Sequence, residues 1–330
     1  MKLAVLGAGA WGTALAIRFA ELHQVVLWSR DADQAASMAA SRSNPRYLPD
    51  VVFPANLSVE ADFAQAVAGA DLVLVVTPLS GLRPTLKALR ALDQRAPLLW
   101  ACKGLEAGTM KFPHQVADEE MAADVPRGML SGPSFAQEVA RGQPAAVTIA
   151  SNNPQFARET VNALNTSVLR LYASDDLIGV EIGAAVKNVL AIAAGICDGL
   201  NLGLNARAAL LTRGLVEMAR FGAAVGAHQE TFMGLAGIGD LLLTATGDLS
   251  RNRRVGLLLA QGLNLDDVLA NLGHVAEGVP AAREVLKQAQ ALGVDMPITE
   301  GVCRVLFENA KVSEVISTLM ERAPRMENGL

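Results

Sequence analysis

Residues 2–12, KLAVLGAGAWG, decide the fold of this 330-residue chain. The aliphatic run KLAVL is typical of a buried parallel strand, and a GxGxxG pattern follows it directly. In such a pattern Gly7 allows a tight turn, Gly9 lets the backbone approach a pyrophosphate, and Gly12 permits close packing of a helix on the strand. Unpaired N–H groups at the start of that helix favour phosphate. The order of strand, glycines, helix and second strand predicts a dinucleotide site.

The same segment has an alternative interpretation. A positive charge at Lys2 followed by apolar residues also resembles a secretory signal. However, the charged region is only one residue long. A second strand, residues 23–30 (HQVVLWSR), also follows the expected helix, as a nucleotide-binding unit requires. We therefore favour the nucleotide-binding interpretation.

Strands and helices alternate over the first half of the chain, and residues 44–49 (NPRYLP) are expected to form a loop. This alternation predicts an α/β, Rossmann-like domain with a doubly wound parallel sheet and helices on both faces. After residue 172 clear strands vanish, and Ala, Leu and Gly recur with helical spacing. We therefore expect a dinucleotide-binding domain at 1–172 and an all-helical, substrate-binding and catalytic domain at 173–330. Residues 181–200, apolar nearly all round, should form a buried helix.

The composition argues against several partners and kinds of site. The net charge of −5 argues against a nucleic-acid partner, and no run of apolar residues is long enough to predict a membrane anchor. An odd number of widely spaced cysteines argues against a disulfide framework and fits a reducing cytoplasm: Cys102, Cys197 and Cys303. The histidines lack paired ligand spacing, so no metal site is expected: His23, His114, His228 and His274.

The end of the second strand bears on the choice of cofactor. An acidic residue there favours the ribose hydroxyl of NAD, whereas an arginine suits the 2′-phosphate of NADP. The strand ends with Ser29 and Arg30, both able to bind a phosphate, while Asp31 and Asp33 come slightly later. We favour NADP and keep NAD as the alternative, since Arg30 is also consistent with an ordinary solvated charge.

Lys187 lies in the middle of the apolar segment 181–200. A charged lysine is costly in such surroundings, and burial lowers its pKa. Lys187 is therefore a candidate general acid/base. A lysine that extends to solvent or pairs with a carboxylate is an equally good interpretation of the sequence.

Further polar residues follow in the second half. Asp240 comes directly after a flexible Gly-Ile-Gly turn, and residues 250–254 (SRNRR) form the densest basic cluster of the chain, just before a helical stretch. Ser250, Arg251 and Asn252 at a helix start make a candidate phosphate-binding corner. A solvated basic loop is the alternative for this cluster.

Three residues of the first half also lie where substrates bind in open α/β sheets. Lys103 closes the expected strand 97–104, and Gly132 and Ser134 belong to the segment that ends the strand after it. Ligands of such sheets bind at the carboxyl ends of the strands, so all three are substrate-site candidates.

Eight segments together resemble the bacterial NAD(P)-dependent sn-glycerol-3-phosphate dehydrogenases, over nearly the whole chain. They are GAGAWGTALA (7–16), TPLSGL (77–82), CKGLE (102–106), SGPSFAQEV (131–139), EIGAAVKNVLAIAAGI (181–196), GLAGIGDLLLTATG (234–247), SRNRRVG (250–256) and AEGVPAA (276–282). Members of this family interconvert sn-glycerol 3-phosphate and dihydroxyacetone phosphate by hydride transfer, and the product supplies the glycerol backbone of phospholipids.

The resemblance implies roles for individual residues. Lys187 would be the proton donor and acceptor. The substrate site would comprise Lys103, Gly132, Ser134, Asp240, Ser250, Arg251 and Asn252. Besides the loop glycines, the cofactor would contact Trp11, Arg30, Lys103, Ala136, Arg251, Val275 and Glu277. Many relatives are homodimers, which makes a homodimer a possibility here. The alternatives are another two-domain dehydrogenase, acting on a hydroxy acid or sugar phosphate, and a nucleotide-sensing protein without catalysis.

Overall fold

The computed structural model describes residues 1–272 and 276–322, and the chain divides into two compact units. Unit 1 consists of Met1–Cys102 and Pro113–Leu177, and unit 2 of Lys103–Phe112 and Ile178–Leu330. The units differ in detail from the predicted domains, because residues 173 and 174 complete the last strand and Lys103–Phe112 belongs with the second unit.

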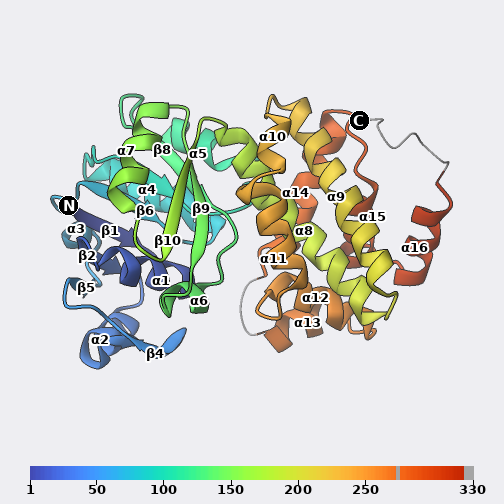
Figure 1. The fold of residues 1–330 in the computed structure, drawn as a ribbon, viewed down its shortest axis with the longest axis horizontal. Coiled ribbons are helices and arrows are strands. Elements are labelled where there is room, and N and C mark those ends of the chain that lie inside the picture. The colour runs from blue at the N-terminus through green and yellow to red at the C-terminus, as the bar shows by residue number, and fades with distance from the viewer. Residues whose placement is uncertain (273–275, 323–330) are drawn as a thin grey trace. The chain divides into compact units, whose positions relative to one another are not determined.

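Unit 1 contains an eight-stranded sheet whose strand order reverses beside its first strand (Figure 1). In sheet order the strands are β10 (Leu169–Ser174), β9 (Ala145–Ala150), β8 (Arg127–Ser131), β7 (Leu98–Trp100), β6 (Leu72–Val75), β1 (Lys2–Leu6), β2 (Gln24–Trp28) and β5 (Leu57–Glu60). The chain runs outward from β1 to β5, then returns to β6 and continues the other way. This reversal is the doubly wound architecture that the sequence predicts.

Helices cover both faces of this sheet. They are α1 (Ala10–Phe19), α2 (Ala32–Ser41), α3 (Phe63–Val67), α4 (Leu82–Ala91), preceded by the 3₁₀ turn η1 (Leu79–Gly81), α5 (Pro113–Glu120), α6 (Ala136–Ala140) and α7 (Pro154–Leu164). Leu72 and Leu74 of β6 join a hydrophobic cluster with α1, α6 and α7. Val73 and Val75, which point the other way, are equally buried. Burial on both faces explains why these strands are aliphatic throughout.

Two expectations from the sequence are corrected. The sheet is not parallel throughout, because β8 and β9 pair antiparallel and β10 follows the direction of β9. The connection between β8 and β9 holds only the short helix α6 and returns the chain at the edge where β8 ends. Residues 44–49 are not simply a loop, since β3 (Ser43–Asn44) and β4 (Leu48–Val52) form an antiparallel ribbon.

Unit 2 is helical in its described part. Its elements are α8 (Leu177–Gly199), α9 (Leu204–Ala224), α10 (Gln229–Phe232), the π-helical turn η2 (Leu235–Gly239), α11 (Asp240–Thr246), α12 (Arg251–Ala260), α13 (Leu265–Leu272), α14 (Gly278–Ala291), α15 (Pro297–Phe307) and α16 (Val312–Met320). Helix α8 is long and apolar enough to cross a membrane, but nearly all of its most apolar stretch is buried inside the protein. It is the core helix of this unit, as the sequence predicts.

Glycines allow other elements to approach α8 closely. A side chain at Gly195 would collide with the Arg253 carbonyl, and one at Gly256 of α12 would collide with the Ile192 carbonyl. One at Gly183 would collide with the Ala236 carbonyl of η2. These backbone contacts determine which residues of η2 and α12 face the core helix.

A buried carboxyl group, Glu217 of α9, holds the start of α15. It accepts hydrogen bonds from the backbone N–H groups of Ile298 (2.6 Å) and Thr299 (3.2 Å) and from the Thr299 hydroxyl (3.2 Å). Burial raises the pKa of Glu217 to about 7, although these hydrogen bonds and the charge of Arg220 oppose the shift.

We therefore predict a specific pH dependence of folding stability. Because the folded protein holds the Glu217 proton more tightly than the unfolded chain, this contribution is fully present below about pH 4.5 and lost as the pH rises through about 7. Glu217→Gln should remove it, so the variant should gain stability relative to the parent between pH 5 and pH 8, by on the order of 3 kcal/mol. Urea unfolding at the two pH values measures this. Glu321→Gln, at an exposed position, is the control, and an identical pH dependence of Glu217→Gln and the parent would contradict the assignment.

Candidate active site

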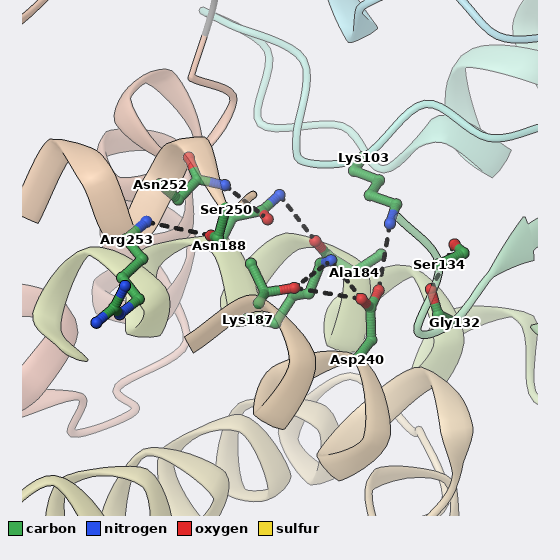
Figure 2. Close-up of polar contacts among 11 residues, drawn as sticks. Lys103, Gly132, Ser134, Ala184, Lys187, Asn188, Asp240, Ser250, Asn252 and Arg253 are labelled. Atoms are coloured by element: carbon green, nitrogen blue, oxygen red, sulfur yellow. Dashed lines mark hydrogen bonds and ion pairs between the residues drawn. The ribbon is translucent and has the colours of Figure 1, made fainter. Parts of the chain in front are cut away.

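Two lysines share one buried carboxylate in unit 2 (Figure 2). The Lys187 ammonium group donates to Asp240 Oδ1 at 2.6 Å and to Thr244 Oγ1 at 2.9 Å. Lys103 donates to Asp240 Oδ2 at 3.2 Å. The side chains of Lys187 and Asp240 are only 6% and 2% exposed, and that of Lys103 is 15% exposed. A carboxylate with two ammonium partners leaves a net positive charge on this largely buried trio.

The local sequence explains how these side chains meet. Gly183 lies one helical turn before Lys187 on the same face of α8, so the close contact with Ala236 brings η2 against that face. The π-helical turn leads directly into Asp240, the first residue of α11, and such turns are frequent at functional sites. Lys103 arrives on the segment Lys103–Phe112, whose Leu105 and Phe112 side chains belong to the hydrophobic core of unit 2.

The surroundings shift the pKa values of Lys187, Lys103 and Asp240 in different directions. Burial lowers the pKa of Lys187 to about 8, helped by the nearby charge of Lys103 and opposed by Asp240. Burial also disfavours the charged form of Lys103, but Asp240 and Glu277 outweigh it and raise the Lys103 pKa. The two ammonium groups likewise outweigh burial and lower the pKa of Asp240. Lys187 is therefore the member of the trio that can gain and lose a proton near neutral pH.

Lys187 also keeps one donor available. An ammonium group has three N–H bonds, and Asp240 and Thr244 accept from two of them. The third can donate to an oxygen atom of a bound substrate. Of the two interpretations that the sequence left open, the structure shows that Lys187 pairs with a carboxylate. The acid/base role stays a prediction, and the lowered pKa of Lys187 is compatible with it.

Most residues of the basic cluster at the start of α12 have partners within the protein, whereas Arg251 is exposed. Ser250 caps the helix by accepting from the Arg253 N–H, and Arg253 itself pairs with Asp198 (2.8 Å). Asn252 is buried, donating to Asn188 Oδ1 (2.9 Å) and accepting from the Gly278 N–H (2.9 Å), and so it links α8 to α14. Arg251, by contrast, is exposed and forms no ion pair with any described residue.

Glu277 lies in the same unit, directly before α14. Burial raises the pKa of its carboxyl group, and the charges of Lys103 and Arg251 partly offset this shift. Glu277 therefore connects electrostatically the lysine pair and the basic cluster. Val275 lies outside the described residues.

The glycine loop of unit 1 fits a dinucleotide. Gly7 has a φ of +124°, and a side chain there would meet the Val76 carbonyl. A side chain at Gly12 would collide with the Gly7 carbonyl, whereas one at Gly9 would meet nothing within 4 Å. The protein itself therefore requires Gly7 and Gly12, and Gly9 leaves open space for a ligand. Helix α1 follows, with no acidic residue in its first turn to repel phosphate.

Two amide side chains anchor this loop. Asn44, fully buried, and Gln34 both donate to the Ala8 carbonyl at 3.0 Å, and Asn44 also donates to Thr13 Oγ1 at 2.8 Å. The loop lies where the strand order reverses between β1 and β6, the position at which ligands bind in doubly wound sheets. Nothing in the sequence pattern alone assigns Asn44 to this loop.

The remaining cofactor candidates in unit 1 differ in exposure. Ser29 is buried and its hydroxyl donates to Gln34, while Asp31 caps α2 by accepting from the Gln34 N–H. Arg30 is exposed and has no partner among the described residues. Trp11 and Ala136 are half-buried against the core of this unit.

Gly132 and Ser134 form the turn after β8. Gly132 has a φ of +143°, and a side chain there would crowd Val147. The Ser134 hydroxyl donates to the Gly132 carbonyl at 2.9 Å. Both residues therefore have a structural role in this turn in addition to any contact with a ligand.

The comparisons with known proteins agree over nearly the whole chain. The family model described as NAD-dependent glycerol-3-phosphate dehydrogenase N-terminus matches residues 2–157, and the model of the C-terminus matches residues 176–317. The chain belongs to this family. Curated proteins named glycerol-3-phosphate dehydrogenase [NAD(P)+] are 57% identical in Dechloromonas aromatica (strain RCB) and 58% identical in Aromatoleum aromaticum, over 99% of this chain and 99% and 100% of those proteins.

A solved structure extends this result to three dimensions. The crystal structure of glycerol-3-phosphate dehydrogenase from Coxiella burnetii has a TM-score of 0.93 and 42% sequence identity, covering 97% of this chain and 99% of that one. This family of oxidoreductases acts on small molecules. The fold class predicted from the sequence is therefore confirmed.

Sequence reasoning missed two polar residues of the site. Thr244 accepts from Lys187, and Asn188 holds Asn252. Thr244 follows Asp240 by four residues, and so a helical interpretation of this segment would have placed both on one face. Asn188 adjoins Lys187 within an otherwise apolar helix, which is itself a signal for a buried polar contact.

The charge arrangement predicts the effect of Asp240→Asn. Since Asp240 raises the pKa of Lys187 against burial and Lys103, the variant should lower that pKa from about 8 by about 1–3 units. An NMR titration of nitrogen-labelled lysine side chains measures it. Asp248→Asn, which removes an exposed carboxylate from the same unit, should leave the titration of Lys187 unchanged. A Lys187 pKa that stays the same or rises in Asp240→Asn would show that the carboxylate does not control this proton.

Proposed function

We propose that this protein is an NAD(P)-dependent sn-glycerol-3-phosphate dehydrogenase, which reduces dihydroxyacetone phosphate reversibly to sn-glycerol 3-phosphate for glycerophospholipid synthesis. The observation that carries the proposal is the buried Lys187, held by Asp240 and with a pKa of about 8. A ketone reductase needs such a proton donor beside a cofactor site. Membership of the family supports the same substrate class.

The two domains bind different molecules. Residues 1–172 bind the dinucleotide, supported by the open space at Gly9 and the start of α1. Residues 173–330, joined by Lys103, bind the substrate and hold the catalytic lysine. The cofactor residues are Gly7, Gly9, Gly12, Trp11, Arg30, Lys103, Ala136, Arg251, Val275 and Glu277. When bound, NADPH or NADH supplies the hydride.

Lys187 supplies the proton. As the carbonyl oxygen of the substrate becomes a hydroxyl group, an N–H bond of Lys187 breaks and an O–H bond forms, leaving a neutral amine that regains its proton from solvent. Asp240 and Thr244 hold Lys187 in place throughout. Lys103, whose pKa is raised, stays charged and stabilises the negative charge that develops on the oxygen.

The phosphate of the substrate binds to the corner formed by Ser250, Arg251 and Asn252, with Lys103, Gly132 and Ser134 completing the substrate site. Arg251 is exposed at the first turn of α12, where helix N–H groups also favour an anion. Anchoring the phosphate lets binding energy orient the carbonyl group.

Three further properties belong to this proposal. The protein acts in the cytoplasm, prefers NADP to NAD, and forms a homodimer. The burial of the three cysteines supports the first, and the exposed Arg30 supports the second. The exposed Leu204 of α9 supports the third.

The first experiment measures NADPH and NADH oxidation with dihydroxyacetone phosphate. The parent protein should turn over, and Lys187→Met, which keeps the volume of the side chain, should lose about 10²–10⁴-fold in kcat because the proton donor is gone. Binding of the cofactor, followed by fluorescence, should survive. Lys311→Met, at an exposed position of the same unit, should leave kcat unchanged. Retention of most activity by Lys187→Met would refute the assigned role.

A comparison of NADPH with NADH tests whether Arg30 binds the 2′-phosphate of NADP. Arg30→Ala should raise KM for NADPH and leave KM for NADH nearly unchanged, because only NADPH carries the 2′-phosphate. Arg158→Ala, an exposed arginine of α7 in the same unit, is the matched control. If the ratio of the two KM values is the same in Arg30→Ala and the parent, Arg30 does not read the phosphate.

A further inference from the structure

A hollow of about 600 Å³ lies in unit 2 between α8, α9, α15 and α16, and no residue of the Lys187–Asp240–Lys103 cluster lines it. Residues 206, 209, 210 and 213 of α9 and residues 312, 315, 316 and 319 of α16 face it. Both sets have the i, i+3, i+4, i+7 spacing of a core-facing helix stripe. These stripes normally pack against another helix, but here they border empty space of the size of a small-molecule site, about 300–1,000 Å³.

Apart from a few charged residues, the lining is mostly aliphatic, and the described residues that form it include no aromatic side chain. An aromatic ligand is usually held by aromatic residues, whereas a flexible alkyl chain needs only methyl and methylene contacts. The deep wall is formed by residues such as Ile196 and Val302, which are 7% and 3% exposed. An alkyl chain that enters the hollow can contact these buried side chains.

The charged groups of the wall favour a negative head group. Arg213 is half-buried and forms no hydrogen bond or ion pair with any residue that the structure describes. The other charged groups are engaged: Arg220 donates to the Asp295 carbonyl, Arg322 pairs with Asp295, and Glu217 holds the start of α15. A half-buried guanidinium without a partner among the described residues is a natural site for a carboxylate or a phosphate.

We infer that this hollow binds a single-chain amphiphile with an anionic head group, its alkyl chain lying between α8, α9, α15 and α16 and its head group paired with Arg213. Leu202 and Met320, which line the hollow and are 44% and 79% exposed, mark its opening to solvent. A carboxylate and a phosphate monoester share the required chemistry, and the experiment distinguishes them. The site uses none of the residues assigned to the reduction of dihydroxyacetone phosphate, so its test is independent of that proposal.

The experiment titrates the full-length protein with dodecanoate, dodecyl phosphate and dodecylammonium by calorimetry, each below its aggregation concentration. One anion or both should bind at one molecule per chain, and dodecylammonium should bind on the order of tenfold or more weakly because it meets Arg213 with the same charge. Binding of one anion only identifies the head group. Failure of both anions to bind, or equal binding of dodecylammonium, overturns the inference.

Three variants locate the site. Arg213→Gln should weaken anion binding by on the order of tenfold, the effect of one lost charge-assisted hydrogen bond. Ala206→Trp, which fills the hollow, should abolish binding, and Ala208→Trp on the same helix, outside the lining, should not change it. If Ala206→Trp fails to fold by circular dichroism, Ala209→Trp at the exposed edge of the lining replaces it. Unchanged affinity in the folded tryptophan variant places the ligand elsewhere and overturns the inference.

Discussion

The pairing of the Asp240 carboxylate with two lysines is the interaction on which the buried polar site of unit 2 depends. A buried lysine would ordinarily lose its proton to escape the cost of desolvation, and two adjacent buried lysines would repel each other as well. Asp240 accepts from Lys187 and from Lys103 on separate oxygen atoms, so both can carry charge in the same small volume. The pKa of Lys187 still falls to about 8 because burial and Lys103 together oppose the one carboxylate. The arrangement therefore yields one fixed cation and one exchangeable proton.

Backbone contact at glycines makes this arrangement possible. Helix α8 carries Gly183, Gly195 and Lys187, and each glycine admits a carbonyl group that any side chain would exclude. The first contact places η2, and hence Asp240, opposite Lys187; the second places α12, and hence Asn252, near Asn188. Such close packing is rigid, since no flexible side chain lies between the two backbones. A rigid frame holds a short Lys–Asp hydrogen bond in a way that exposed loops do not.

Much of the fold could be predicted from local sequence because each signal has a short range. The aliphatic runs, the glycine loop and the apolar segment around Lys187 are all contained within about one element, and the structure places a strand, a turn and a buried helix there. The antiparallel direction of β9 and the ribbon at Ser43–Val52 were not predictable, because strand direction is decided by partners far along the chain. Thr244 and Asn188 were not predicted as site residues for a similar reason, because their importance comes from their contacts with Lys187 and Asn252.

The sequence by itself determined the chemistry that this protein carries. It placed a phosphate-compatible glycine loop after an aliphatic strand, a lysine within an apolar helix, and a basic cluster at a helix start, since periodicity and residue type are local properties. Only the tertiary structure decided which charges meet. Lys103 lies 84 positions from Lys187 and 137 from Asp240, and it joins them because Lys103–Phe112 packs into the core of unit 2. A pKa depends on distance and burial, and neither is a property of the sequence until the chain has folded.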